Sequence, residues 1–505
     1  MKDLNHPTTS ARKRNSVLIT CAAFVVLLCA AYYFVVIYPA NRANREYAEQ
    51  LASSWISMES SMPESLPVFD PVPPTGEDAE LISADQALTG IADVTRDGNK
   101  DRASQSPSAI ERLQFNAARL SNSVVRTVKA SVEYNNDYER SGQLSFYGTT
   151  CTFHYPSQRF VLYGLSDEDL SAKWRELSGG RYDNLLYDCL NIKAQLQLCD
   201  WAYLQLLNQI SERICGIGNE ATFLQAYLYA QSGYKMRLAT STDYRTLYLL
   251  FAAYHNLSER IFFSMDDGNY YFFANSGHGS YHICTASFGR GNKYMSLAIT
   301  ANQRFASKPV KSRKKIIIDK QEVTLYVNEN LLDFYTDYPR GYYNNVEDYC
   351  KLYAEPSIDD DVRRQVYPYL RQAIADMTET DAANYLLHWV QTHFDYKTDG
   401  EAWGYERAFF PTETLYYPYC DCEDRSILYS RLMRDLVGSD VILLHVPNHM
   451  ATGVHFKQDE SVYGSYLEIE GNRYYICDPT IMGVGAPIGT AMKCMQSQPI
   501  TYIKI

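Results

Sequence analysis

The sequence has no excess of basic residues. Lysine and arginine together number 47 against 59 aspartates and glutamates, so the formal net charge is −12, and the isoelectric point is near 5.4. Beyond the N-terminus there is no basic stripe of the kind that a phosphate backbone would contact. The chain is therefore not expected to bind nucleic acid.

The sequence also lacks a second pair of ligands that would complete a metal-binding motif around Cys420 and Cys422. Structural zinc sites usually combine two such pairs. The sequence therefore predicts no metal and no cofactor. A metal site is left as an alternative because four soft ligands are available, namely Cys420, Cys422, His449 and Cys477.

Signals for cleavage or lipidation are missing around residues 16–38, which carry no charge. No small-x-small site follows them, and Cys21 and Cys29 are preceded by threonine and leucine rather than by a small residue. The segment is long enough to cross a bilayer, and the basic residues before it predict a cytoplasmic N-terminus. We therefore expect a single-pass membrane protein whose C-terminal domains are periplasmic or extracellular. A cleaved signal peptide is the competing interpretation.

The rest of the chain divides by composition. Residues 41–110 are rich in serine, proline, aspartate and glutamate, which is typical of a flexible stalk. Hydrophobic density rises from about Leu113. Ten of the twelve cysteines follow the predicted membrane helix, so some are expected to pair in an oxidising compartment. The predicted segments are a cytoplasmic tail 1–15, a transmembrane helix 16–38, a stalk 39–112, and folded domains 113–300 and 301–505.

The segment with the strongest candidates for catalytic residues is Cys-Asp-Cys-Glu-Asp-Arg-Ser at residues 420–426. We expect a helix that begins at Cys422 and ends at Gly438, with Asp421 as its N-cap and Asp424 completing an acidic capping box. A thiol at the first helical position faces the positive end of the helix dipole, which favours the nucleophilic thiolate. The helical period separates an apolar face from polar faces. The apolar face consists of Leu428, Leu432, Met433 and Leu436. The polar faces carry Arg425, Arg431, Arg434 and Asp435.

A histidine and an aspartate follow at the ends of predicted strands. His449 begins one strand and Asp478 ends another, which makes them candidates for a base and an orienting acid. His445 and His455 compete with His449, but His445 lies inside an apolar strand and His455 lies deeper along its own strand. The strand patterns, separated by turns, cover residues 441–446, 449–456, 467–470 and 473–478.

A cysteine at a helix N-terminus, a histidine at a strand start and Asp-Pro at a strand end resemble the transglutaminase-like (papain-like) cysteine hydrolases, over roughly residues 380–485. The Cys-Glu-Asp at the helix start is similar to their bacterial members. The resemblance implies that Cys422 attacks an amide or ester carbonyl to form a thioester, that His449 takes and returns the proton, and that Asp478 fixes the imidazole tautomer. It also implies an oxyanion donor besides the Cys422 N–H, with candidates in the aromatic loop 394–419: Trp403, Tyr417 and Tyr419.

The folded part contains a weak internal repeat. Helical patterns at residues 199–209 and 218–233 match those at 380–390 and 422–438, and strand patterns follow in the same order. We therefore expect an upstream copy of the C-terminal domain.

The upstream copy has no cysteine at the nucleophile position, which falls among residues 217–220. The acid position falls near Ala274 or Asn275. The domain 113–300 is thus predicted to be a degenerate, non-catalytic copy. The alternatives are coincidental similarity and a second working site that uses Cys215 and His255.

The expected fold class is α+β: an N-terminal transmembrane helix and flexible stalk, then two papain/transglutaminase-like domains, each with a helix packed on an antiparallel sheet. The expected activity is hydrolysis of protein or peptide amides by an exported, membrane-anchored cysteine enzyme with its catalytic domain at residues 301–505. Three alternatives are acyl transfer to an amine, a non-catalytic envelope binding protein, and a Cys422 that is a disulfide half or a buried thiol.

Overall fold

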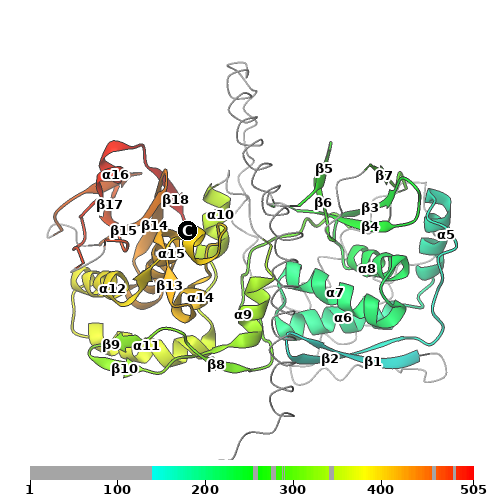
Figure 1. The fold of residues 1–505 in the computed structure, drawn as a ribbon, viewed down its shortest axis with the longest axis horizontal. Coiled ribbons are helices and arrows are strands. Elements are labelled where there is room, and N and C mark those ends of the chain that lie inside the picture. The colour runs from blue at the N-terminus through cyan, green and yellow to red at the C-terminus, as the bar shows by residue number, and fades with distance from the viewer. Residues whose placement is uncertain are drawn as a thin grey trace, which may run out of the picture. The chain divides into compact units, whose positions relative to one another are not determined.

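The computed structural model describes residues 139–505 apart from short gaps at 254–256, 258–259, 275–279, 287, 289–290, 340–345, 458–461 and 482–484. The described elements are coloured along the chain in Figure 1. The predicted tail, membrane helix and stalk lie outside the described residues.

The fold class expected from the sequence is wrong and is corrected here to a mixed α/β chain with two curled, five-stranded antiparallel sheets. Among the described residues, no helix is both long enough and apolar enough to cross a membrane. A crossing needs about 20 mostly apolar residues. The longest described helix, α7 (Asp200–Cys215), has 16 residues and starts with an acid.

The N-terminal half of the described chain contains a hairpin, helices and the first of the two sheets. The hairpin and helices are β1 (Glu139–Phe146), β2 (Thr149–Pro156), α5 (Asp167–Leu177), α6 (Asp183–Leu196), α7 and α8 (Asn219–Gln231). The sheet consists of β3 (Met236–Ser241), β4 (Leu247–Ala252), β5 (Phe262–Met265), β6 (Gly268–Phe272) and β7 (Tyr281–Ile283). The helices predicted over residues 199–209 and 218–233 are confirmed as α7 and α8.

Short strand pairs and helices follow the first sheet. They are β8 (Pro309–Lys311), β9 (Ile316–Ile318), β10 (Gln321–Val323), β11 (Tyr326–Asn328), α9 (Glu329–Thr336), α10 (Val346–Ala354) and α11 (Asp360–Ile374). Strand β8 pairs with β11, and β9 pairs with β10.

The C-terminal part carries the predicted site. Its elements before the sheet are α12 (Glu379–His393), β12 (Asp395–Tyr396), α13 (Asp399–Ala402), α14 (Pro411–Tyr416), β13 (Tyr419–Cys420), α15 (Cys422–Leu432) and the π-helical turn η3 (Met433–Val437). The sheet and the last helix are β14 (Asp440–Val446), β15 (His449–His455), β16 (Tyr466–Ile469), β17 (Asn472–Cys477), α16 (Lys493–Ser497) and β18 (Thr501–Lys504). Gly438 ends the π-helical turn with a φ of 78°, which confirms the predicted helix end.

The two sheets have the same topology. The strand order is β5-β6-β4-β3-β7 in the first sheet and β16-β17-β15-β14-β18 in the second. Numbered in chain order within each sheet, both run 3-4-2-1-5, and all neighbours are antiparallel. In each half a helix ends a few residues before the first strand, α8 before β3 and α15 with η3 before β14. The order of elements is therefore the same in both halves.

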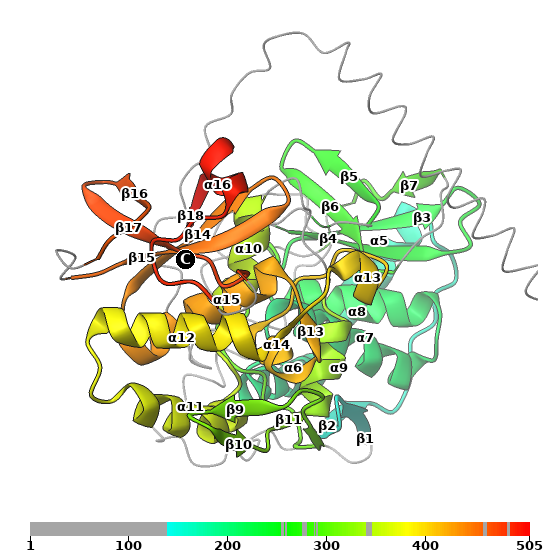
Figure 2. The ribbon, with the colours of Figure 1, turned by 60° about the vertical axis from the view of Figure 1, so that its left-hand side comes forward.

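Helix α15 packs against β14, β15 and α12, as the view in Figure 2 also shows. Ser426 on α15 donates its hydroxyl to the carbonyl oxygen of Met450 at 3.1 Å, which ties the helix to the start of β15. Each buried apolar side chain contributes roughly 1.5–3 kcal/mol, so this packing holds the helix start firmly. The shared core includes Leu386, Leu387, Val390, Leu428, Tyr429, Leu432 and Val454.

Candidate active site

Helix α15 begins at Cys422, as the sequence predicts. The N–H of Asp421 donates to Asp424 Oδ2 at 3.3 Å, and the Asp421 side chain accepts from the N–H of Asp424 in return. This acidic capping box confirms the predicted pair and closes the first turn. Asp424 Oδ1 also accepts from the N–H of Phe409 at 2.7 Å, which ties the aromatic loop to the helix start.

The Cys422 thiol is half-buried among acids. Its sulfur donates to Glu423 Oε2 at 3.1 Å. Burial, followed by the charges of Glu423 and Asp421, raises the pKa of the thiol, and the N–H of Met450 opposes this shift by donating to the sulfur. The expectation that the helix start favours the thiolate is therefore wrong here. A helix dipole contributes about 0.3–1 kcal/mol, which burial beside two carboxylates outweighs.

Replacing Glu423 by glutamine is expected to make Cys422 more reactive. Glutamine keeps the size and an acceptor oxygen but removes a charge that raises the thiol pKa. Each unit of fall in that pKa gives a roughly tenfold larger thiolate fraction at neutral pH. The measurement is the pH profile of Cys422 alkylation by iodoacetamide, followed on the Cys422 peptide by mass spectrometry. The exposed Glu168 on α5, changed to glutamine, is the control. A midpoint that stays constant or rises in Glu423→Gln would contradict this account.

His449 and Asp478 form a buried pair. His449 opens β15 directly after Asn448, whose left-handed φ of 62° makes a tight turn that asparagine tolerates. Asp478 follows the last residue of β17. His449 Nε2 and Asp478 Oδ2 lie 2.8 Å apart, and the two residues are 8% and 1% exposed. Asp478 Oδ1 accepts from the N–H of Thr480 at 3.0 Å. Two of the three predicted catalytic residues are thus in direct contact.

The thiol lies at the start of β15 without bonding to this pair. The N–H of Met450, which directly follows His449 in the chain, acts on the sulfur and lowers the pKa of the thiol. Within the described residues no hydrogen bond joins Cys422 to His449, because the S–H is directed at Glu423. The structure therefore places Cys422 near Met450, the residue after His449. The S–H proton of Cys422 is directed at Glu423 and not at His449.

Two of the three predicted oxyanion donors belong to an aromatic cage around Arg407. The guanidinium carbon lies 4.5 Å from the ring centre of Trp403 and 5.3 Å from that of Tyr417. Arg407 also pairs with Glu413 at 2.6 Å. The third candidate, Tyr419, lies on β13 and is 43% exposed. In the described chain none of these three side chains has a hydrogen bond to the thiol.

Tyr396 is a neighbour of the thiol that the sequence patterns missed. It lies on β12, which pairs in parallel with β13 and sets Tyr396 opposite Cys420, two residues before Cys422. Burial, and then the charge of Cys422, raises the pKa of the Tyr396 hydroxyl, so this phenol stays protonated and can donate. A strand of two residues is too short to leave a periodic pattern in the sequence.

The two competing histidines have other surroundings. His445 is half-buried in β14, where burial and the neighbouring His449 lower its pKa. His455 ends β15, with Nδ1 3.1 Å from the carbonyl oxygen of Arg473. Neither forms an ion pair with a carboxylate among the residues that the structure describes, whereas His449 does.

Carboxylates gather around the start of α15, and their oxygens could hold a hard cation such as Ca²⁺ or Mg²⁺. Three sets have ligand atoms within 4.8 Å of one another: Asp421 with Cys422 and Glu423, Asp399 with Asp421 and Asp424, and Asp399 with Glu406 and Glu423. Burial raises the pKa of the Asp421 and Asp424 carboxyls, so protonation also relieves their repulsion. In the described chain, one soft-ligand set does not converge: Cys420, Cys422, His449 and Cys477.

All ten cysteines of the described chain are free thiols. The disulfides expected from the predicted compartment are therefore not formed among them. Cys422 in particular is not a disulfide half, which leaves its sulfur available for chemistry.

Asn219 occupies the nucleophile position of the upstream half. It is the first residue of α8, as Cys422 is of α15. Its Oδ1 accepts from the N–H of Leu247 at 2.9 Å, and its Nδ2 donates to the carbonyl of Arg245 at 2.8 Å. Leu247 opens β4, as His449 opens β15. The Asn219 amide thus links the start of α8 to the start of β4. At the corresponding two positions, the C-terminal half has the thiol of Cys422 and the imidazole of His449.

The residues considered for a second working site are only partly described. Cys215 ends α7, before the start of α8, and burial raises the pKa of its thiol to about 12. Ala274 is described, whereas His255 and Asn275 lie outside the described residues.

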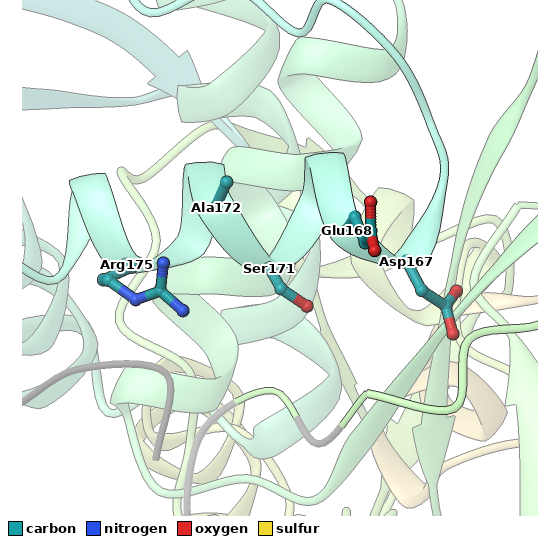
Figure 3. A pocket seen from close by; sticks show the side chains of 5 residues that line it. All are labelled: Asp167, Glu168, Ser171, Ala172 and Arg175. Carbon is teal, nitrogen blue, oxygen red and sulfur yellow. The ribbon is translucent and has the colours of Figure 1, made fainter. Parts of the chain in front are cut away.

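A shallow depression of about 360 Å³ lies along α5 (Figure 3). Its lining residues all belong to this one helix, and they are Asp167, Glu168, Ser171, Ala172 and Arg175. No predicted site residue is among them, so this depression is separate from the candidate site.

Comparison with known protein families, with curated proteins and with solved structures finds no match for this chain.

Proposed function

We propose that this chain is a cysteine hydrolase of the transglutaminase-like type that acts on amide bonds of proteins or peptides. The observation that carries the proposal is the buried His449–Asp478 hydrogen bond of 2.8 Å, on the strand β15 against which the Cys422 helix packs. An imidazole held at Nε2 by a carboxylate has Nδ1 left to exchange a proton with a nucleophile. A cysteine on a helix start beside such a pair has the parts that covalent catalysis needs.

The proposed reaction begins when substrate binding turns the thiol from Glu423 toward His449. The Cys422 sulfur bonds to the carbonyl carbon while its proton passes to His449 Nδ1. The N–H of Cys422 and the hydroxyl of Tyr396 donate to the oxyanion that forms. The carbon–nitrogen bond then breaks, the amine leaves with the proton from His449, and a thioester remains.

Water completes the cycle. It gives a proton to His449 as its oxygen bonds to the thioester carbon, and the carbon–sulfur bond then breaks. The acid product leaves, and the proton returns to the sulfur of Cys422. Asp478 stabilises the imidazolium that exists between these two proton transfers.

The proposal is tested with an unfolded protein substrate and a glutamine peptide, each incubated with the chain and a labelled amine. Hydrolysis of backbone amides splits the chain and adds one water, and hydrolysis of glutamine side chains converts them to glutamate. Both outcomes leave the label free and support the proposal. Incorporation of the label would indicate an acyl transferase instead. If no product forms and a thiol-directed peptide aldehyde does not bind, the chain is a binding protein rather than an enzyme.

The proposal includes a non-catalytic upstream half. Its support is the shared 3-4-2-1-5 strand order together with Asn219 and Leu247 at the positions of Cys422 and His449. An asparagine amide that is already bonded to the backbone is neither an acid nor a base near neutral pH, and it offers no nucleophilic sulfur. Catalysis is therefore assigned to the C-terminal half alone.

A further inference from the structure

The corner that carries Asp478 is held by two buried side chains outside the proposed triad. Asp478 follows β17, and its carboxylate is the partner of His449. Gln391 on α12 donates a hydrogen bond to the backbone carbonyl of Asp478. Arg425 on α15 donates a hydrogen bond to the backbone carbonyl of Pro479. The position of the carboxylate therefore depends on contacts from two other elements.

Gln391 is 3% exposed, and its side-chain amide makes three hydrogen bonds to backbone groups, which together form the Gln391 fork. Its Nε2 donates to the carbonyl of Asp478 at 2.8 Å and to that of Ala486 at 3.1 Å, while its Oε1 accepts from the N–H of Ala486 at 2.9 Å. A Cβ on Gly485 would lie 2.6 Å from Oε1, and Gly485 has a φ of +77°, so a side chain there would disturb the fork. One amide thus holds both ends of the segment that follows β17.

Arg425 is fully buried, and within the described residues it forms no ion pair with a carboxylate. Its Nη1 donates to the carbonyl of Pro479 at 3.3 Å, and its Nη2 donates to the carbonyl of Phe394, which lies at the end of α12. The guanidinium carbon lies 5.4 Å from the ring centre of Tyr396. Burying a charge without a counter-charge is costly. In the described surroundings, the two carbonyl contacts and the face of the Tyr396 ring offset part of this cost.

Arg425 lies three residues after Cys422, on neighbouring positions of one helix face. A single helix therefore carries both the proposed nucleophile and a side chain that holds the acid corner. We infer that Gln391 and Arg425 are positioning residues that keep the Asp478 carboxylate against His449, an inference that rests on the proposed function. Among the described residues, neither side chain has a hydrogen bond to Cys422 or His449.

The test is a double-mutant cycle between Gln391 and Asp478, read as the rate of Cys422 alkylation by iodoacetamide at pH 7. Gln391→Met keeps the volume but removes the fork, so we expect the rate to fall roughly ten- to a hundredfold through misplacement of the acid. In an Asp478→Asn background the same change is expected to have no further effect, because no carboxylate is left to position. An equal fall in both backgrounds is what a merely structural role predicts, and it would overturn the inference.

Two further variants sharpen the test. Gln303 is a matched control, because it is 5% exposed and its hydrogen bonds within the described chain also go to backbone alone, namely Cys199 N–H and Ala301 C=O. Gln303→Met is expected to lower thermal stability without slowing alkylation, and slowing equal to that of Gln391→Met would count against the inference.

Arg425→Lys keeps the charge, but one ammonium cannot span both carbonyls, so the rate of Cys422 alkylation should fall. If Asp478→Asn alone leaves the rate unchanged, the proposed triad fails and the inference fails with it.

Discussion

Replacing Cys422 by alanine is expected to abolish hydrolysis while leaving the fold intact. The sulfur is the atom that bonds to the carbonyl carbon, and loss of a triad nucleophile costs up to about 10⁶-fold in kcat. The side chain is half-buried and contributes little core volume, so the thermal midpoint should change by only a few degrees. The measurements are kcat on an unfolded protein substrate and a thermal denaturation curve.

Cys215→Ala is the matched control for this experiment. Cys215 is the cysteine that a second working site in the upstream half would use, and its thiol pKa is raised by burial. We expect its replacement to leave kcat unchanged. Full activity in Cys422→Ala, or loss of activity in Cys215→Ala, would move the nucleophile away from the proposed site.

Replacing His449 by glutamine is expected to lower kcat by roughly two to four orders of magnitude, the contribution of a positioned general base. Glutamine can still bond to Asp478, so the buried carboxylate keeps a partner and the fold is retained. It cannot carry the proton from the Cys422 thiol, whose pKa is raised. The loss should therefore shrink as the pH rises, because hydroxide then removes the proton instead. The measurement is kcat against pH for the wild type and the variant.

His445→Gln and His455→Gln control for the other two candidate bases. His445 is half-buried in β14, and His455 contacts a backbone carbonyl. Both variants are expected to retain kcat within a few-fold. A collapse of activity in either one, with His449→Gln unaffected, would reassign the base.

Several features of the site could be predicted from neighbouring residues alone. The capping box of Asp421 and Asp424, the helix start at Cys422 and the end at Gly438 depend on contacts within a few residues, so the local pattern specifies them. The strand predicted over residues 441–446 is confirmed as β14 for the same reason, since a short apolar run bounded by turn residues is a local signal.

Other features depend on segments that are distant in the chain. The helical period set Arg425 on a polar face, yet the side chain is fully buried because the carbonyls of Phe394 and Pro479 accept its protons. In the sequence, Gln391 is one polar residue among others in a predicted helix. Its hydrogen bond to the carbonyl of Asp478 is apparent only in the tertiary structure. Tyr396 lies next to the thiol through pairing with a strand more than twenty residues away.

The sequence by itself determined where the site helix starts, where the strand that His449 opens begins and where the strand that Asp478 follows ends, because caps, turns and short apolar runs are short-range effects. Only the tertiary structure decided the protonation of Cys422 and the contact between His449 and Asp478. The pKa of a buried group depends on how much water it loses and on which charges surround it. Both are set by how distant parts of the chain pack together, and no local pattern contains that information.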